Sequence, residues 1–543
     1  MATPQPQRSL IGGFFRSLLA HPGSPALELG ELSLSYEQLW NYAGRITACL
    51  NDTLDPSEKV VAVLADRSVG AYGGILGVLG SGRGYVPLNP KFPLERTLVM
   101  LRASGCKTLV VGRECAATLQ SMLLRLDEYL DKPLTLIIPD PDWEPDSKLL
   151  SSELLSSHRV IAARQLASLK IADPRDPIVD GSGTAYLLFT SGSTGMPKGV
   201  AVSQSNAVAY MEYAARRFGI HGGDRCSQNF DLTFDLSVHD LFTCWDGGAT
   251  LCPYAEQTLT PATLIDELGL TCWFSVPSVA MFASKLGLLE PGAFPTLRWS
   301  LFCGEALSAS LAAAWQQAAN NSILENLYGP TEATIAITYY RWDAATSPAE
   351  CVRGLVPIGW PFDGQQVCVV NDDLAPVPAG ESGELCLGGS QVTRGYLNDP
   401  EKTAKSFVRL KHTGDQVWYR TGDLVRQDER GCLFYLGRRD FQVKVNGYRV
   451  ELQEIDLALR EAAQTELAVA IPWPLSDGSA SGIVGVLSGS DPAHDEKIIA
   501  ACESRLPRYM VPNRIYHFPQ IPLNVNGKID RGKITEMLAN WGQ

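Results

Sequence analysis

A loop rich in glycine and hydroxyl residues is the part of this sequence best suited to binding phosphate. It covers residues 190–198 and directly follows an apolar run at 185–189. Such a loop leaves backbone N–H groups free and can turn its hydroxyls inward, which suits polyphosphate oxygens. It is not a Walker A loop, since G-x-x-x-x-G-K-[ST] is absent, and a flexible surface turn is the alternative interpretation. The candidate phosphate-binding residues are Thr190, Ser191, Gly192, Ser193, Thr194 and Lys198.

Four further motifs follow this loop in order along the chain. They are Tyr328-Gly329-Pro330-Thr331-Glu332, Tyr419-Arg420-Thr421-Gly422-Asp423, Gly437-Arg438-Arg439-Asp440 followed by Gln442-Val443-Lys444, and Asn526-Gly527-Lys528-Ile529-Asp530. Together with the loop they resemble the signature motifs of the adenylate-forming superfamily, which comprises nonribosomal peptide synthetase adenylation domains, acyl- and aryl-CoA synthetases, and luciferases. The resemblance covers nearly all residues from about 30 to 535, with departures at 203–206 and at Asn446.

The resemblance implies an enzyme that uses ATP and Mg²⁺ to convert a carboxylate into an acyl-adenylate. Because two anions must be brought together in line, positioning and charge neutralisation carry most of this reaction. Lys528 would bridge the substrate carboxylate and the phosphate, Glu332 would hold Mg²⁺, and Thr331 would lie near the α-phosphate. Asp440 resembles the hinge about which a small C-terminal domain turns after adenylation, opening a channel for a pantetheine thiol. The implied nucleoside-binding residues are Gly304, Glu305, Ala306 and Tyr328 around the adenine, with Asp423 and Arg438 at the ribose.

One acidic residue indicates the kind of acid that is activated. Asp235 resembles the residue with which adenylation domains pair the substrate ammonium, a requirement that acyl- and aryl-CoA synthetases lack. A capping or surface aspartate is the alternative interpretation. The other implied pocket positions hold no acid and no fixed cation, so a charged substrate side chain would be buried unpaired. The substrate-binding set is Phe234, Asp235, Leu236, His239, Phe274, Leu301, Cys303, Leu327, Ile335 and Ala336.

This set is similar to pockets for proline, with serine, cysteine or alanine next. His239 either donates a hydrogen bond to a hydroxyl substrate or packs as a neutral ring, and a metal role is least favoured because no His or Cys partner lies at ligand spacing. Only 13 residues follow Asp530 in the 543-residue chain, so we expect a stand-alone enzyme that loads the phosphopantetheine thiol of a separate carrier protein. The segment 387–390, Leu-Gly-Gly-Ser, mimics a carrier attachment motif but is interpreted as a strand end. An acyl- or aryl-CoA synthetase is the rival enzyme, and a catalytically silent scaffold is the rival from another class.

These residues must be positioned by an α/β fold. Short apolar runs alternate with helical patterns through the first three-quarters of the chain, which predicts parallel sheets covered by helices. Strands are expected at 60–64, 108–111, 185–189, 273–276 and 299–302, and a helix at 72–79. Runs at 366–370 and 383–387 predict a small β-barrel, and a strand at 442–445, a helix at 452–463 and a strand at 467–470 predict an α+β segment. We therefore expect a large N-terminal domain of two doubly wound sheets plus the barrel over residues 1–439, and a small mobile α+β C-terminal domain over residues 440–543.

Composition narrows the range of partners and compartments. The formal net charge of −13 argues against sequence-independent binding of nucleic acid, which needs clustered Lys and Arg. None of the 13 cysteines forms a C-x-x-C pair, which fits a reducing cytoplasm and gives no zinc motif. Arg16 interrupts the apolar stretch at 9–20, so an amphipathic helix is favoured over a signal peptide. No uncharged apolar run reaches the length of about 18 residues that a membrane span needs.

Overall fold

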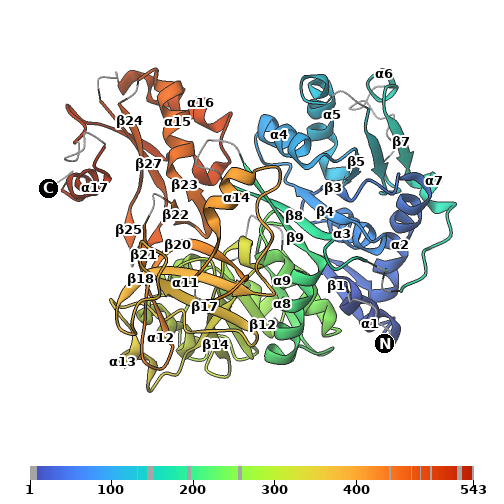
Figure 1. Cartoon of the computed structure of the whole chain (residues 1–543). Coiled ribbons are helices and arrows are strands. Elements are labelled where there is room, and N and C mark those ends of the chain that lie inside the picture. The colour runs from blue at the N-terminus through green and yellow to red at the C-terminus, as the bar shows by residue number, and fades with distance from the viewer. Residues whose placement is uncertain are drawn as a thin grey trace.

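The computed structural model describes residues 9–130, 133–143, 152–175, 177, 179–191, 197–254, 260–411, 413–439, 442–465, 467–476, 479–488, 492–522 and 529–540. These residues confirm the expected α/β class. Two large sheets carry helices on their faces, a smaller curled sheet lies beside them, and an α+β segment forms the C-terminal end (Figure 1).

The first large sheet is parallel except at one edge. Its strand order is β7-β6-β5-β3-β4-β8-β9, and only the β8–β9 pairing is antiparallel among the described residues. Its strands β3, β4, β5 and β6 are almost entirely buried, as expected of parallel strands covered on both faces, which is why they read as apolar runs. The strands are β3 (Val60–Leu64), β4 (Gly84–Leu88), β5 (Thr108–Val111), β6 (Thr135–Ile138), β7 (Arg159–Ala162), β8 (Thr184–Thr190) and β9 (Lys198–Ser203).

The second large sheet is parallel in its centre and antiparallel at both edges. Its order is β16-β15-β14-β13-β12-β10-β11-β1-β2, with the antiparallel pairings at β14–β15, β15–β16 and β1–β2. The strands are β1 (Pro25–Leu29), β2 (Leu32–Ser35), β10 (Arg225–Gln228), β11 (Thr250–Pro253), β12 (Cys272–Ser275), β13 (Trp299–Phe302), β14 (Ile323–Tyr328), β15 (Thr338–Arg341) and β16 (Trp360–Pro361).

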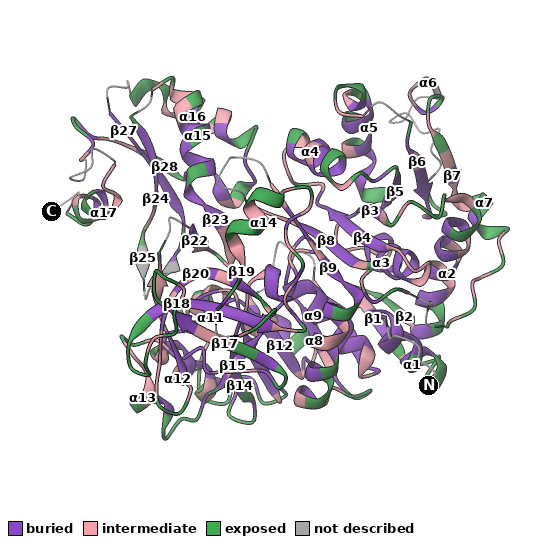
Figure 2. Cartoon of the chain, viewed as in Figure 1, coloured by how far each residue is buried: buried purple, intermediate pink, exposed green. Residues whose placement is uncertain are grey.

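Helices cover these sheets, and Figure 2 shows buried residues along the strands and exposed ones on the outer faces of the helices. The amphipathic N-terminal helix expected from the sequence is present, with the Phe14 and Phe15 rings against Trp245 and Trp40 at centroid distances of 5.6 and 4.7 Å. No helix in the described part of the chain is long and apolar enough to cross a membrane. The helices before residue 440 are α1 (Gly12–Ala20), α2 (Tyr36–Thr53), α3 (Val69–Gly80), α4 (Leu94–Ser104), α5 (Ala116–Leu124), α6 (Ser152–Leu155), α7 (Ala163–Ala167), α8 (Gln204–Phe218), α9 (Leu236–Asp246), α10 (Pro261–Glu267), α11 (Pro277–Lys285), α12 (Ala309–Ala318), α13 (Ser347–Glu350) and α14 (Pro400–Ser406).

The small barrel expected after residue 355 is present as a curled antiparallel sheet. Its path runs β17-β18-β20-β19, and β21 also pairs with β20. The Leu-Gly-Gly segment at 387–389 forms the end of β18, in agreement with the structural interpretation of that motif. The strands are β17 (Gln365–Val370), β18 (Ser382–Gly389), β19 (Phe407–Arg409), β20 (Val417–Gln427) and β21 (Leu433–Arg438).

The segment after residue 441 has hydrophobic cores of its own. Two clusters of buried side chains draw all of their described members from residues 443–538. A buried ion pair, Arg96 of α4 with Glu454, joins this segment to the first large sheet at 2.5 Å. Its elements are β22 (Gln442–Val445), β23 (Tyr448–Glu451), α15 (Leu452–Ala463), β24 (Ala468–Pro472), β25 (Leu475–Ser476), β26 (Ser479–Ala480), β27 (Ile483–Leu487), α16 (Asp495–Glu503), β28 (Arg514–His517) and α17 (Arg531–Ala539).

Candidate active site

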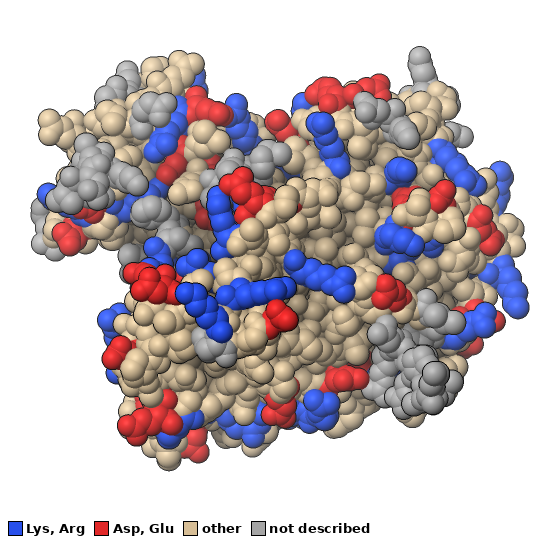
Figure 3. All heavy atoms as spheres, viewed as in Figure 1, with Lys and Arg blue, Asp and Glu red and all other residues tan. Residues whose placement is uncertain are grey.

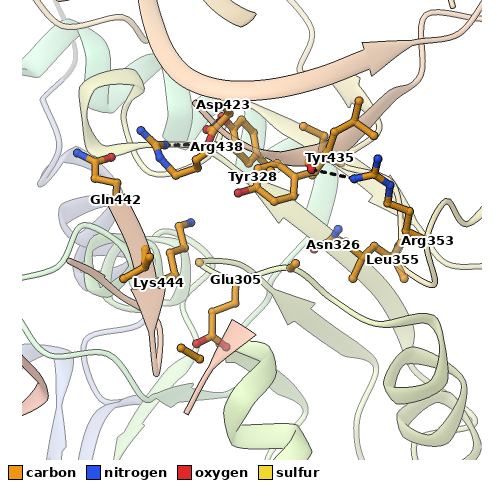
Figure 4. Close-up of a pocket in the computed structure, with 18 of the residues that line it drawn as sticks. Glu305, Asn326, Tyr328, Arg353, Leu355, Asp423, Tyr435, Arg438, Gln442 and Lys444 are labelled. Carbon is orange, nitrogen blue, oxygen red and sulfur yellow. Dashed lines mark hydrogen bonds and ion pairs between the residues drawn. The ribbon is translucent and has the colours of Figure 1, made fainter. Parts of the chain in front are cut away.

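A cavity of about 450 Å³ lies where the second large sheet, the small curled sheet and the β22 strand meet. Strands β12, β13 and β14 run parallel, so the loops that follow them emerge at one edge, the usual place for a ligand site in such sheets. The six residues expected to bind the nucleoside all line this cavity: Gly304, Glu305, Ala306, Tyr328, Asp423 and Arg438 (Figure 4).

The Asp423 carboxylate is held in place from two sides. The Tyr328 hydroxyl donates a hydrogen bond to it from the end of β14, and Arg438 Nη1 of β21 contacts its other oxygen at 2.7 Å. Figure 4 shows these three side chains grouped at one wall of the cavity. A fixed acceptor pair of this kind suits the two hydroxyls of a ribose.

The cavity also contains two cationic residues that were not among the expected site residues. Arg353, from a loop after α13, donates to the Leu436 carbonyl oxygen at 3.3 Å, and Lys444 of β22 reaches the opposite wall (Figure 4). The Lys444 side chain is buried, and this burial lowers its pKa. The signal for Lys444 was its place in the motif after residue 440, whereas the loop that holds Arg353 carries no recognisable pattern.

Glu332, four residues after Tyr328, is fully buried. Tyr396 Oη donates to one of its carboxylate oxygens at 2.8 Å, and Arg449 Nη1 of β23 contacts the other at 2.8 Å. Burial alone would raise the pKa of Glu332, but Arg449 and Lys198 outweigh it and lower the pKa to about 2. The carboxylate is therefore ionised at any working pH.

Glu332 would need further ligands, such as phosphate oxygens of the substrate, to hold a magnesium ion. In the described residues, no group of three or more His, Cys, Asp or Glu side chains could hold a metal ion without other ligands. Mg²⁺ commonly binds through one or two carboxylates together with substrate phosphates and water, and the Glu332 carboxylate supplies that kind of ligand.

The described ends of the phosphate loop are buried or half-buried. Ser191 is buried, and Thr190 Oγ1 is buried without a hydrogen-bond partner among the described residues. A buried hydroxyl without a hydrogen-bond partner is unfavourable. A hydrogen bond from Thr190 to a phosphate oxygen of a bound ligand would remove that cost. Lys198 contacts Glu451 Oε1 of β23 at 3.2 Å, and its burial lowers its pKa.

Asp235 lies at the N-terminus of α9 and lines a second cavity, of about 80 Å³. Its Oδ2 accepts a hydrogen bond from the Ile335 backbone N–H at 3.0 Å. Ile335 and Thr334 both have positive φ, 71° and 58°, a strained conformation that aims this N–H at the carboxylate. Burial raises the pKa of Asp235 to about 7, because the charged carboxylate is unfavourable in this site. A cation bound beside the carboxylate would stabilise its charged form.

Only some of the other expected substrate-binding residues line a cavity. Phe234, Leu236 and Cys303 line the cavity with Asp235, and Leu327 lines the larger nucleoside cavity. The remaining members are buried and line neither cavity: His239, Phe274, Leu301, Ile335 and Ala336.

His239 packs as a neutral ring one helical turn after Asp235 on α9. Its Nδ1 lies 2.7 Å from the Tyr210 hydroxyl, and its ring contacts Phe274 edge-on at a centroid distance of 4.5 Å. Burial lowers the pKa of His239 to about 3. Of the two roles considered for this residue, the geometry favours packing.

Several expected residues lie outside the described part of the chain. They are Gly192, Ser193 and Thr194 of the phosphate loop, the expected hinge Asp440, and the expected catalytic Lys528.

Comparison with known proteins identifies the class that this fold and cavity define. Residues 14–397 match the family model described as AMP-binding enzyme, and the chain belongs to this family. The D-alanine--D-alanyl carrier protein ligase of Lacticaseibacillus casei (strain BL23) is 31% identical over 96% of this chain and 98% of its own length. Tyrocidine synthase 3 of Brevibacillus parabrevis is 31% identical over 94% of this chain, which is 7% of that protein.

The solved structures agree with this assignment. The Vibrio cholerae adenylation domain AlmE in complex with glycyl-adenosine-5'-phosphate matches with a TM-score of 0.86 at 33% identity, covering 99% of both chains. The resemblance to the adenylate-forming superfamily, and to adenylation domains within it, is therefore confirmed.

Proposed function

We propose that this enzyme uses ATP to activate a small neutral amino acid and then transfers the aminoacyl group to the phosphopantetheine thiol of a carrier protein. The observation that carries the proposal is the buried Asp235 carboxylate at the end of a small cavity that also reaches Thr190 and Ser191. An amino acid bound there would place its ammonium at Asp235 and its carboxylate toward the phosphate-binding residues.

The first half-reaction joins two anions. An oxygen of the substrate carboxylate attacks the α-phosphorus of ATP, an oxygen–phosphorus bond forms, and pyrophosphate leaves with the electron pair. Asp423 and Arg438 would hold the ribose, while Thr190 and Lys198 would meet the phosphates. Mg²⁺ held with Glu332 would neutralise phosphate charge when bound. Lys528 is assigned by its motif to the developing charge on the α-phosphate, where such a cation acts most strongly.

In the second half-reaction the thiol sulfur attacks the acyl carbon of the aminoacyl-AMP. A carbon–sulfur bond forms, AMP leaves, and the thiol proton is lost to solvent. The carrier protein is proposed because the Lacticaseibacillus casei relative, similar over nearly its whole length, is named for one. We also propose that residues 440–543 are a mobile domain that turns about Asp440 between the two half-reactions.

The size of the Asp235 cavity bears on the substrate. Its roughly 80 Å³ must accommodate the backbone of the amino acid as well as its side chain, since Thr190, Ser191 and Thr331 line it too. His239 lies one helical turn after Asp235 on α9, and Phe274 packs against its ring. We therefore rank glycine and alanine ahead of proline, which the sequence ranked first, and ahead of serine and cysteine. The names of the relatives fit this order, with D-alanine for one and a glycyl adenylate for another.

An ATP–pyrophosphate exchange panel tests the proposal. It should contain the proteinogenic amino acids, D-alanine, and fatty and aromatic acids. Glycine or an alanine enantiomer should give the highest exchange, followed by proline, serine and cysteine. Labelled substrate should then appear on a phosphopantetheinylated carrier and not on its apo form.

The alternative is an acyl- or aryl-CoA synthetase of the same superfamily. Highest exchange with a fatty or aromatic acid would support that alternative, and highest exchange with glutamate or lysine would contradict the pocket assignment. Exchange with no acid at all would contradict adenylation itself.

A further inference from the structure

Asp240 is a buried acid that the proposed reaction does not use. On the face that Figure 3 shows, acidic side chains lie at the surface among basic ones, where water and cations stabilise their charge. Asp240 lies instead in the second turn of α9 and is 2% exposed. A carboxyl group at such depth is stable only when its hydrogen bonds are complete or its charge is removed.

One oxygen of this carboxyl accepts two backbone hydrogen bonds. Asp240 Oδ2 accepts the Asn229 N–H at 3.1 Å and the Phe230 N–H at 3.4 Å. These two residues follow β10 and begin the loop that leads to Asp235 at the N-terminus of α9. The Asp240 side chain therefore joins the two ends of segment 229–240, in the middle of which Asp235 lines the substrate cavity.

The other oxygen of the carboxyl faces no donor. Asp240 Oδ1 is buried without a hydrogen-bond partner among the described residues, and so is Asn229 Oδ1. The Asn229 amide cannot be turned over to supply a donor, because its Nδ2 donates to the Phe274 carbonyl oxygen at 2.6 Å. Two buried acceptor oxygens thus lie on residues that already contact each other, and a proton on Asp240 would provide the donor that both lack.

The surroundings of Asp240 favour the protonated form. Burial raises the pKa of Asp240 well above its ordinary value, and the opposing effects of the two backbone N–H groups and of Arg67 are smaller. Arg67 itself donates to the Asn229 carbonyl oxygen at 2.7 Å. Tyr72 and Tyr210 are the other titratable groups that act on this site, and both stay neutral because burial raises their pKa as well.

We propose that Asp240 is a positioning residue that stays protonated, donates to Asn229 Oδ1, and so holds segment 229–240 in the shape that presents Asp235 to the substrate. This inference rests on the proposed function, in which Asp235 binds the substrate ammonium. A neutral acid suits the role, because a second negative charge on α9 would favour protonation of Asp235 and so oppose ammonium binding. The same link steadies the pocket wall, since Asn229 also holds the Phe274 carbonyl and the Phe230 ring contacts the Phe274 ring at 4.8 Å.

Infrared spectroscopy of the full-length enzyme without ligands tests the proton directly. The spectrum of Asp240→Asn is subtracted from that of wild type at about pH 9, where Asp235, with a pKa of about 7, is ionised. The difference should contain the carbonyl band of a protonated carboxyl group, and this band should shift in D₂O. Absence of the band would overturn the proposal.

Kinetics of pyrophosphate exchange test the positioning role. The substrate is glycine or whichever alanine enantiomer exchanges best. Asp240→Ala should raise the KM for this amino acid about tenfold or more and leave the KM for MgATP within about twofold, because segment 229–240 loses its closing contacts. Asp240→Asn keeps two acceptor lone pairs for the backbone and gains an N–H donor for Asn229 Oδ1, so both KM values should stay within about twofold of wild type.

Asp224→Asn is the matched control for a buried acid. Asp224, just before β10, is 1% exposed, and Arg298 Nε contacts its Oδ1 at 2.6 Å. Burial alone would raise the pKa of Asp224, but Arg298 and Thr271 outweigh it and lower the pKa. Asp224→Asn should lower the midpoint of thermal unfolding by about 5 °C or more, since an ionised partner is lost, and leave the amino acid KM unchanged. Asp240→Asn should shift the midpoint by less than about 2 °C.

Equal losses of stability in Asp240→Asn and Asp224→Asn would show that Asp240 is ionised and would overturn the proposal. A rise in the amino acid KM in Asp240→Asn equal to that in Asp240→Ala would do the same. If Asp240→Ala loses stability without any rise in that KM, Asp240 does not position Asp235. The infrared band and the behaviour of Asp240→Asn decide the proposal even if Asp240→Ala fails to fold. Both the infrared and the unfolding measurements need no substrate, so their outcome is separate from that of the exchange panel that tests the proposed function.

Discussion

At the residue scale, the buried carboxylate of Asp235 links substrate choice to pH. Its pKa is raised to about 7 by burial, with the Ile335 N–H and Thr331 acting in the opposite direction. Below that pH the carboxyl holds a proton and cannot pair with an ammonium. An amino acid must therefore bind a form of the enzyme that becomes rarer as the pH falls.

We predict that kcat/KM for the amino acid in pyrophosphate exchange falls about tenfold per unit below pH 7 and levels off above it. Asp235→Asn should lower exchange by about two to three orders of magnitude, since one partner of a buried pair is lost. A profile measured from about pH 5 to pH 9 gives the first result. Asp231→Asn is the control, because burial also raises the pKa of the half-buried Asp231, which does not line the Asp235 cavity. A flat profile in wild type would show that Asp235 does not meet the substrate ammonium.

Phe274 gives a second prediction at this scale. Its ring packs edge-on against His239, which lies one helical turn after Asp235 on α9. Phe274→Ala should cost about 3–5 kcal/mol of stability and shift exchange toward bulkier amino acids such as leucine, because the truncation opens space behind His239. Phe294→Ala is matched for burial and ring packing, against Trp315 in a different core, and should cost stability without any shift. The measurements are thermal unfolding and the exchange panel, and unchanged selectivity in Phe274→Ala would separate this ring from substrate choice.

At the element scale, regular structure followed closely from local pattern. The strands at 60–64, 108–111 and 299–302 and the helix at 452–463 have the predicted bounds, because short apolar runs and strong 3.6-residue periodicity are local signals. Helix α3 begins three residues before its predicted start, since Ser68 Oγ accepts the Ala71 N–H and caps it there. Such a cap adds a turn that hydrophobic pattern alone does not show.

Fewer features of the site than of the fold could be predicted from the sequence. Ordered motifs indicated the residues that line the nucleoside cavity, because loops after neighbouring parallel strands meet at one edge. They did not indicate that Arg449 pairs with Glu332, 117 positions away, or that Phe274 packs behind His239. Contacts of this kind depend on how separate elements meet and which way each side chain turns.

The turn of the β22–β23 hairpin supplies the prediction at the element scale. Gly447→Ala should slow thioester formation from preformed adenylate by about tenfold or more while amino acid-dependent exchange stays within about threefold, because a Cβ would overlap Val276 only when the hairpin is docked. Gly431→Ala is the control for backbone strain, since Gly431 has the same φ of 82° but meets nothing closer than 3.7 Å. Single-turnover loading of a carrier is the measurement. Equal effects of the two substitutions would show that strain, and not docking, limits transfer.

At the scale of the whole molecule, the cores after residue 441 are separate from those of the large sheets. The two parts are joined in this structure by polar contacts and by a small group of rings. The polar contacts are the Arg96–Glu454 pair, the Gly447–Glu305 hydrogen bond and the pairs at Arg449 and Glu451. The rings of Tyr448 and Tyr509 contact Phe234, and Tyr509 also contacts Phe92. Ion pairs and hydrogen bonds can be exchanged for other partners at little net cost, whereas a shared apolar core cannot. This division supports the proposal that residues 440–543 move as a unit.

The hinge assigned to Asp440 supplies the last prediction. Proline fixes φ near about −65° and removes a backbone donor, so Asp440→Pro should restrict the rotation that brings the β22–β23 hairpin to Glu332 and Lys198. The conversion of adenylate to thioester should then slow by about tenfold or more, while pyrophosphate exchange changes by less than about threefold, because exchange needs only the arrangement that precedes the turn. Asp440→Ala keeps backbone freedom and should leave both half-reactions within about threefold of wild type. Quenched-flow measurement of each half-reaction separates these cases. An equal fall in both would mean that the chain turns elsewhere and that the boundary between the two domains does not lie at residue 440.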